Sequence, residues 1–268
     1  MLRKPGVASL AIVFSIILLF ASCATTRTAP ISQPQPDTYV LEAPTGDIYV
    51  FKVLPKDKKE SEDEVVPRPT RKITAFAIQP ELKWSAPSYD ENDFFCGSIR
   101  AECKTSINNV HFESFPDLNS FLETLPSDSH MRTLGISSNS NRSNEEKRNV
   151  TINRTYIYAI KHEGDKDYHL IIGDSEEETF INVEISGLPD EHHADFDILL
   201  SVRQTLKNFL SNARLRESGS YNVPDKPIPV SVSGSLFFDF HPAVGPKKYS
   251  TKTSWEIHPV SKIEFLRR

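Results

Sequence analysis

Apolar and polar residues in the second half of the chain alternate with a period of two, as they do in β-strands. Residues 149–160 follow this alternation, and shorter runs rich in β-branched and aromatic residues follow at 168–172 and 179–185. Polar turns at 162–167 and 173–178, each containing a glycine, separate these runs. The pattern therefore predicts three consecutive strands.

Downstream of these strands, apolar residues recur at spacings of three and four between positions 194 and 214, which predicts an amphipathic helix. Two more strands are expected at 230–240 and 253–265, with Pro259 at a sheet edge or a bend. This element order is that of an OB-fold, a five-stranded Greek-key barrel. An α+β sandwich of the same elements is the alternative, because element order does not fix topology. We favour a mainly β, OB-like barrel over 149–268, since closure removes exposed sheet edges.

Four sequence blocks in this region resemble those of a known family. They are DYHLIIG at 167–173, NVEISGLP at 182–189, GSLFFD at 234–239 and WEIHPV at 255–260. The blocks look like those of a recurring bacterial family of uncharacterised, often exported proteins, over residues 149–265 of this chain. The resemblance implies a shared domain and brings no established activity with it. The function therefore has to be argued from the residues.

The first half of the chain gives weaker signals of secondary structure. β-branched and aromatic residues predict strands at 47–54 and 71–78, and a short amphipathic helix is expected at 116–125. Together these elements indicate a small β-rich region over 38–136. A run of Ser, Asn, Arg, Glu and Lys without large apolar residues then predicts a linker at 137–148.

The first 22 residues have the pattern of a bacterial lipoprotein signal peptide. Arg3 and Lys4 precede an apolar run that is shorter than the roughly 20 residues of a membrane-spanning helix, and small residues lead to Cys23. We expect cleavage after residues 1–22 and attachment of a diacylglycerol to Cys23, which would anchor the protein to a membrane. Residues 23–37, rich in Thr, Pro and Gln, would form the tether.

The composition of the chain limits the cellular compartments and the classes of partner that we expect. The content of 38% hydrophobic and 25% charged residues is ordinary for a globular protein, so the mature part should bury a core. Without Arg3 and Lys4, the net charge of −5 becomes −7, which argues against nucleic acid as a partner. Ala24, and not Asp, follows the lipidation cysteine, and the resemblance to Gram-negative sorting signals implies the outer membrane of the cell envelope. No acidic run follows Cys23, so we expect the periplasmic face.

Two further cysteines, Cys96 and Cys103, have six residues between them. In an envelope compartment that permits disulfides, we expect them to form a bridge. Two unbonded thiols, or half of a metal site, are the alternatives. A second cysteine pair that would complete zinc ligation does not occur in the sequence.

Five polar residues in or beside the predicted strands are candidates for catalysis: His169, Asp239, His241, Glu256 and His258. The last four form two period-two pairs, and each pair shares one strand face. If these faces converge, the carboxylates and imidazoles could bind a divalent metal or perform acid–base chemistry. The alternative is that they hydrogen-bond the backbone at strand ends. Because no metal-binding motif supports the site, we expect neither a metal nor a cofactor.

The second candidate site is a ligand-binding surface formed by Tyr168, Lys247, Lys248 and Tyr249. In OB-folds, the face of strands two and three binds oligomers together with the loops that join strands one to two and four to five. Three of these residues lie in the predicted loop 241–252, between strands four and five. The alternative is that some of the aromatic residues belong to the core.

These observations leave two classes of function. The sequence contains no G-x-S-x-G nucleophile motif, no P-loop and no G-x-G-x-x-G. We therefore favour a lipid-anchored, non-enzymatic envelope module that binds an envelope polymer or a partner protein. The alternative is a metal-assisted hydrolase that uses the histidine and carboxylate residues of the strands.

Overall fold

The computed structural model describes most of the chain, namely residues 38–54, 89–176, 179–210, 219–242 and 244–267. These residues belong to one compact unit. The predicted signal peptide, Cys23, the tether and the predicted strand at 71–78 lie outside the described residues.

Five strands close into a barrel. They are β4 (Asn149–His162), β5 (Tyr168–Gly173), β6 (Phe180–Ile185), β8 (Ile228–Phe238) and β9 (Thr251–Phe265). Their order around the barrel is β4–β5–β6–β9–β8, and β8 pairs again with β4. The β6–β9 pair is parallel and the other pairs are antiparallel. The fold is therefore mainly β with an OB-like barrel, as the element order predicts.

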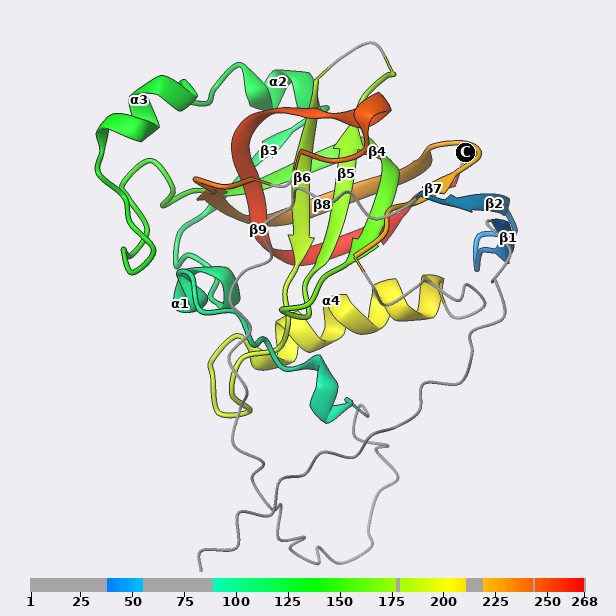
Figure 1. Cartoon of the computed structure of the whole chain (residues 1–268), viewed down its shortest axis with the longest axis horizontal. Coiled ribbons are helices and arrows are strands. Elements are labelled where there is room, and N and C mark those ends of the chain that lie inside the picture. Colours follow the sequence, from blue (N-terminus) through cyan, green and yellow to red (C-terminus); the bar gives the residue numbers. More distant parts are fainter. Residues whose placement is uncertain (1–37, 55–88, 177–178, 211–218, 243, 268) are drawn as a thin grey trace, which may run out of the picture. The chain divides into compact units, whose positions relative to one another are not determined.

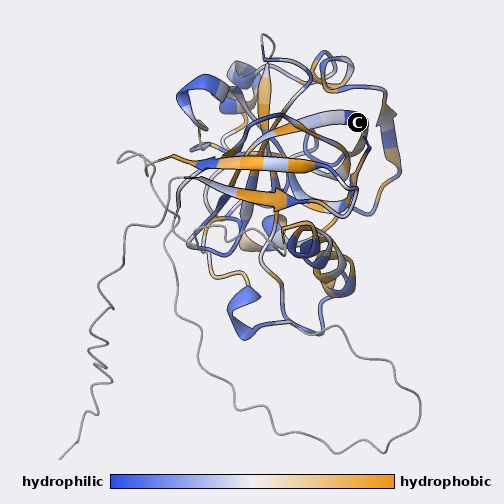
Figure 2. Cartoon of the chain, turned by 90° about the vertical axis from the view of Figure 1, so that its right-hand side faces the viewer, coloured by the Kyte–Doolittle hydropathy of each residue, from blue (hydrophilic) through white to orange (hydrophobic). Residues whose placement is uncertain are grey.

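Helix α4 (Phe196–Phe209) follows β6 and lies below the barrel in Figure 1. Its apolar residues Val202, Leu206 and Phe209 join the hydrophobic core that all five barrel strands line. This contact explains the spacing of three and four in the sequence, because these positions share one helix face. Figure 2 shows that hydrophobic residues are concentrated on the strands.

Strand β9 departs from regular geometry at Pro259. The strand pairs with β6 on one side and β8 on the other, so this proline does not lie at a sheet edge. It lies at an irregularity instead, because the register between β8 and β9 shifts on both sides of the Gly234–Val260 pair. The peptide bond between His258 and Pro259 is cis. Of the two expectations for this proline, the bend is the one observed.

The first half of the chain extends the same sheet. Strands β1 (Thr38–Glu42) and β2 (Ile48–Val53) form an antiparallel hairpin, and β2 pairs with β7 (Asn222–Pro224), which in turn pairs with β4. Strand β3 (Phe112–Phe115) runs parallel to the start of β4. The region 38–136 thus contributes strands to the barrel sheet.

Short helices of the first half complete the hydrophobic core. Helix α2 (Leu118–Leu122) falls within the helix predicted at 116–125, and α3 (Asp128–Thr133) follows it. The side chains of Leu118, Phe121 and Met131 are fully buried in the core that the barrel strands share. Among the helices that the structure describes, none has the length and apolar character needed to cross a membrane.

Residues 93–106, which we call the strap, cross the barrel between α4 and β9 and include α1 (Ala101–Thr105). The Phe95 N–H donates to the Leu188 carbonyl at 2.8 Å, and the Leu188 N–H donates to the Asp93 carbonyl at 2.7 Å. A side chain at Gly187 would have its Cβ only 2.6 Å from Phe95 Cα, so this close approach requires glycine.

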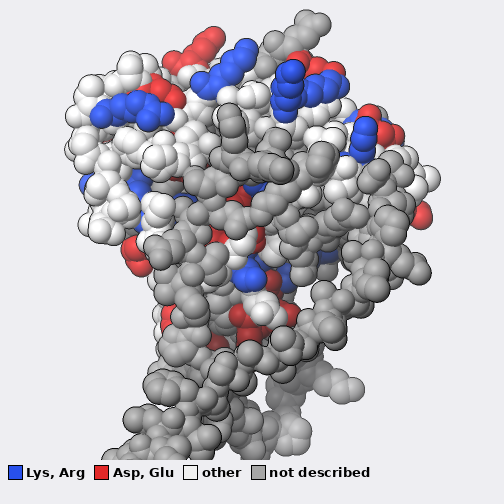
Figure 3. Space-filling model, viewed as in Figure 1, with Lys and Arg blue, Asp and Glu red and all other residues white. Residues whose placement is uncertain are grey.

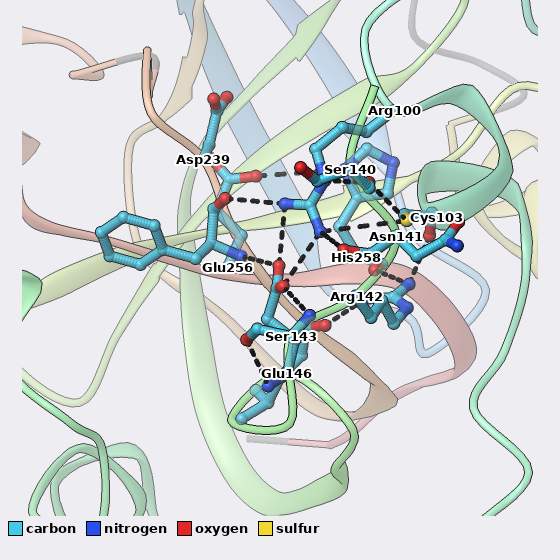
Figure 4. Close-up of polar contacts among 12 residues, drawn as sticks. Arg100, Cys103, Ser140, Asn141, Arg142, Ser143, Glu146, Asp239, Glu256 and His258 are labelled. Atoms are coloured by element: carbon cyan, nitrogen blue, oxygen red, sulfur yellow. Dashed lines mark hydrogen bonds and ion pairs between the residues drawn. The ribbon is translucent and has the colours of Figure 1, made fainter. Parts of the chain in front are cut away.

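Residues 137–148, predicted as a linker, pack on the barrel instead. The Arg100 guanidinium of the strap makes two 2.9 Å contacts with the Glu146 carboxylate (Figure 4). Glu146 also accepts a hydrogen bond from the Phe238 N–H at 2.9 Å, and Arg142 donates to the backbone carbonyl of His258. The segment ties the strap to the barrel because its polar residues, which resemble a linker in composition, find buried partners.

We predict that Glu146→Ala destabilises the protein by about 3–5 kcal/mol, because it leaves the buried Arg100 charge without its partner. Urea unfolding measures the loss. Glu146→Gln keeps the shape and one acceptor, so it should cost less than the alanine variant. A loss below about 1 kcal/mol for Glu146→Ala would contradict a buried ion pair at this position.

Candidate functional site

The outer face of the barrel carries polar side chains on the strands that line the apolar interior. In β5, Leu170 belongs to the hydrophobic core, so the neighbouring His169 faces the opposite side of the sheet. In β6, Val183 belongs to the core and Glu184 faces out in the same way. His169 and Glu184 are directly opposite each other in the β5–β6 pairing. The sheet register therefore places an imidazole beside a carboxylate.

Strand β9 brings two more of the predicted residues to this face. Ile257 belongs to the core, so Glu256 and His258 on either side of it share the outer face. Glu256 is the register partner of Asn182 on β6, and the Asn182 amide donates to Glu256 Oε1 at 3.0 Å. The parallel pairing of β6 with β9 thus unites His169, Glu256 and His258, three of the five predicted catalytic candidates, in one cluster.

Five buried residues and the partly buried Glu163 form a continuous series of contacts in which basic and acidic groups alternate. We call this series the charge chain: Lys161, Glu163, His169, Glu184, His258 and Asp167. At its first end, Lys161 Nζ lies 2.7 Å from Glu163 Oε1, which lies 3.5 Å from His169 Nδ1. His169 Nε2 then lies 2.7 Å from Glu184 Oε1.

At the other end, His258 lies between two carboxylates. Its Nδ1 is 2.8 Å from Glu184 Oε2, and its Nε2 is 3.3 Å from Asp167 Oδ2. Glu256 Oε2 lies 3.9 Å from the same Nδ1. Asp167, Glu184, Glu256 and His258 are each at most 1% exposed. The carboxylates at this end therefore surround one imidazole away from bulk solvent.

Several of these contacts are close without being directed hydrogen bonds. Asp167 Oδ2, Glu184 Oε2, Glu256 Oε2 and both ring nitrogens of His258 are buried and have no partner with hydrogen-bond geometry. Asp167, Glu184 and His258 each offer one potential metal-ligand atom, and these three atoms lie within 4.8 Å of one another. Carboxylate oxygen and imidazole nitrogen are ligands of zinc and related metals. These three residues are therefore the group in the described part of the chain that could hold a metal.

The opposite charges offset the free-energy cost of burying one another. Burial alone would lower the pKa of His169, but the carboxylates of Glu163 and Glu184 outweigh it and raise that pKa to about 10. The pKa of His258 is raised well above its usual value, mainly by Glu184. Burial opposes ionisation of Glu184, yet the two imidazoles hold its pKa well below the usual range. The cluster thus contains two imidazolium groups with an ionised Glu184 between them.

Two neighbouring carboxyl groups are instead held neutral. Burial, assisted by the charge of Glu184, raises the pKa of Glu256 to about 8. Burial and the charge of Asp167 raise the pKa of Asp165 to about 8. Both groups are mostly protonated at pH 7, because burial and the neighbouring negative charges disfavour their ionised forms.

The strap lies over this end of the charge chain. Ser186 Oγ, which follows β6, donates to the Lys104 carbonyl of α1 at 2.5 Å. The Cys96 N–H donates to the Asp165 carbonyl at 3.1 Å. Beneath the strap, the Gly187 N–H donates to Asp167 Oδ1 at 2.6 Å and fixes that carboxylate. The candidate site is therefore enclosed by the first half of the chain.

Asp239 and His241 do not lie on a strand face that joins the cluster. Strand β8 ends at Phe238, so the period-two pattern does not continue through these residues. The His241 N–H donates to Asp239 Oδ1 at 2.8 Å, and the His241 side chain is exposed. Asp239 contributes to the raised pKa of Glu256 through its charge, and this is its connection to the site.

The predicted ligand-binding residues have separate surroundings. Tyr249 is buried and packs on other aromatic rings, which is the alternative considered for the aromatic residues. Lys248 forms an exposed ion pair with Glu176 at 2.9 Å, and Lys247 is exposed. Tyr168 is half-buried against the main core. Among the described residues, these four do not form one aromatic platform.

The disulfide expected between Cys96 and Cys103 is not formed in the structure. Cys96 Sγ donates to the Gly164 carbonyl at 3.4 Å, whereas Cys103 Sγ lies 3.6 Å from the Ser140 carbonyl. The two sulfur atoms are therefore engaged with different parts of the chain. Spacing along the sequence did not reveal this, because both cysteines lie on a strap whose path depends on the barrel.

The sequence analysis missed four members of the charge chain: Lys161, Glu163, Asp167 and Glu184. Three of them lie at or near the polar turn between β4 and β5, where charged residues are usually solvated. The signal that could have found Glu184 is its position inside FINVEI, an otherwise mostly apolar strand. A carboxylate in such a strand needs a buried partner.

Comparison with protein-family models, curated proteins and solved structures gives no match for this chain. The resemblance of the four sequence blocks to an exported bacterial family therefore stays a prediction. On the face shown in Figure 3, acidic and basic side chains of the described residues are interspersed. The argument for function rests on the buried cluster.

We predict that the metal-free protein loses stability as the pH rises from about 6 to 10. Glu256 and Asp165 have folded pKa values raised to about 8 and His169 to about 10, so their contributions are complete below the unfolded pKa values and are lost on deprotonation. Urea unfolding with a chelator at each pH measures the slope of the free energy of unfolding against pH. Glu256→Gln should flatten it, whereas Glu264→Gln, an exposed position on the same strand, should not. An unchanged slope in Glu256→Gln contradicts this account.

Proposed function

We propose that this protein is a lipid-anchored, non-enzymatic binding module of the bacterial cell envelope, and that its binding site is the charge chain on the outer face of β5, β6 and β9. OB-like barrels bind ligands on the face of their second and third strands and on the loop between the first two. Here that face carries His169 and Glu184, and the loop carries Glu163, Asp165 and Asp167. The observation that carries the proposal is the set of buried charged atoms there without directed hydrogen bonds.

Enclosure of the site favours a small polar ligand. The strap covers Asp167 and Glu184, and a long polymer would have to displace it. The proposal that an envelope polymer or a partner protein binds at Tyr168, Lys247, Lys248 and Tyr249 has less support, because Tyr249 is buried in the core. The cluster offers a small ligand several carboxylate and imidazole groups at once.

Metal-assisted hydrolysis is the second candidate function, since three of its five proposed residues, His169, Glu256 and His258, do come together. A catalytic metal site keeps a position open for water or substrate. These three residues are nearly fully buried, with His169 the most exposed at 7%. This burial favours binding over turnover.

The first described hairpin supports the proposed tethering to a membrane. Val40 and Ile48, on its outer face, are 61% and 56% exposed, and Val50, opposite Val40, is 39% exposed. Fourteen residues separate Cys23 from the start of β1. A flexible chain of that length has a mean end-to-end distance of about 20 Å. The exposed apolar side chains of the hairpin would thus lie close to the bilayer. We propose that this bilayer is the outer membrane and that the protein lies on its periplasmic face.

We predict that the mature protein begins at Cys23 and carries a diacylglycerol on its sulfur. Mass spectrometry of the N-terminal peptide from membrane-extracted protein measures this directly. Cys23→Ala should abolish both the modification and signal cleavage, because the thiol is the acceptor. A Cys23→Ala protein that is still cleaved and membrane-bound would disprove the anchor.

We predict that native mass spectrometry of the detergent-extracted protein shows an excess mass over the denatured protein, at one ligand per chain. Glu184→Gln should lose the excess, because this side chain lies between His169 and His258. Glu264→Gln, an exposed change of the same chemistry, should retain it. Equal native and denatured masses for the wild-type protein would count against a ligand in the cluster.

A further inference from the structure

Three donor side chains lie around the end of the charge chain, and three different parts of the barrel supply them. Asp167 immediately precedes β5, Glu184 is on β6 and His258 is on β9. One ligand atom from each lies within 4.8 Å of the others. Ligands of one metal ion with bonds of about 2.0–2.2 Å lie up to roughly 4.4 Å apart. The barrel therefore holds these donors near the spacing that a metal ion requires, with small side-chain adjustments.

An independent observation is the lack of directed hydrogen bonds at this end. Asp167 Oδ2 and Glu184 Oε2 are buried, and so is Glu256 Oε2 beside them, yet none has a partner with hydrogen-bond geometry. Buried polar atoms are nearly always satisfied by protein, water or an ion. Three carboxylate oxygens in this state around one imidazole indicate that a cation completes the site.

Further carboxyl groups surround these donors. Glu163, Asp165 and Glu256 lie beside Asp167, Glu184 and the two imidazoles of His169 and His258. We propose that Asp167, Glu184 and His258 bind one divalent transition-metal ion of the zinc or manganese class. This inference rests on the proposed binding function and names its ligand.

The donor set favours this class of metal. Two carboxylates with one imidazole suit zinc or manganese, whereas calcium prefers oxygen ligands throughout. One ring nitrogen of His258 would bind the ion while the other donates to a carboxylate, as metal-bound histidines commonly do. Glu256 Oε2, 3.9 Å from His258 Nδ1, is a further donor within reach. Burial of every ligand is typical of a closed, structural metal site.

The first measurement is the metal content of the full-length protein, extracted in detergent and purified without chelator. We expect about one equivalent of zinc or manganese by mass spectrometry of the elements, a stoichiometry that follows from one cluster per chain. Chelator-treated protein should rebind one equivalent of the same ion, followed by calorimetry with zinc chloride, manganese chloride and calcium chloride. Binding should raise the melting temperature, because the metal holds three segments of the folded barrel together.

Variants test whether the ion occupies this cluster. Asp167→Asn and Glu184→Gln should each weaken binding by at least about 100-fold, because each removes a charged ligand. Glu264→Gln is the matched control: it removes the same charge from an exposed position on β9, outside the cluster, and should leave the affinity unchanged. His193→Ala removes a partly buried histidine beside the exposed Glu102, outside the cluster, and it should leave the stoichiometry unchanged.

Each result decides the proposal. Failure of chelator-treated wild-type protein to bind zinc or manganese, or equal affinity in Asp167→Asn and the wild type, would overturn it. Binding of calcium alone would overturn the metal class. If native mass spectrometry shows an adduct of another mass that Glu184→Gln loses, the metal inference fails while the binding function stands. If there is neither an adduct nor metal binding, both fail. Should Glu184→Gln not fold, Asp167→Asn and the wild-type titration remain decisive.

Discussion

Glu184 lies between two imidazole rings inside the folded protein, and the rest of the site depends on keeping its charge compensated. Transfer of a carboxylate from water to a protein interior costs several kcal/mol even after relaxation. Here the cost is offset by contacts of 2.7 Å with His169 and 2.8 Å with His258. Each imidazolium in turn requires a further carboxylate, Glu163 on one side and Asp167 on the other. The alternation of basic and acidic groups along the charge chain is thus a consequence of burial.

The strap, in the first half of the chain, helps to maintain this burial. Without the strap, the outer face of β5, β6 and β9 would be open on the side where other OB-like barrels bind ligands. One end of the strap is fixed by Asp93, whose carboxylate contacts Arg203 at 3.0 Å and Lys207 at 2.5 Å. Near its other end, Arg100 contacts Glu146. Pairs of opposite charge therefore fix both ends of the cover over the charged site.

The sequence predicts the barrel well because its strands have alternating or strongly β-branched patterns and α4 has a clear helical period. It also places Glu256 and His258 on one face of β9. It does not predict which strand lies beside β9, because that follows from the parallel β6–β9 pairing between residues distant in sequence. For this reason the sequence did not single out Glu184. Asp239 and His241 lie outside the cluster for another reason, because β8 ends at Phe238.

The strap was harder to predict for a different reason. Its residues have no periodicity, and the segment 137–148 that fixes it has the composition of a linker. Arg100 and Glu146 are 46 positions apart in the sequence, and the role of each becomes clear only from their contact in the fold. Polar residues in irregular segments therefore give little sequence signal even when they are fully buried.

The enclosure of the site bears on what kind of function it performs. A catalytic site must exchange substrate and product at every turnover, so a cover held by buried ion pairs at both ends would slow each cycle. A retained ligand has no such requirement, and burial strengthens its electrostatic contacts because the local dielectric is low. The same cover that disfavours turnover thus favours retention. A small ligand held in this way would stabilise the barrel and its strap as one unit.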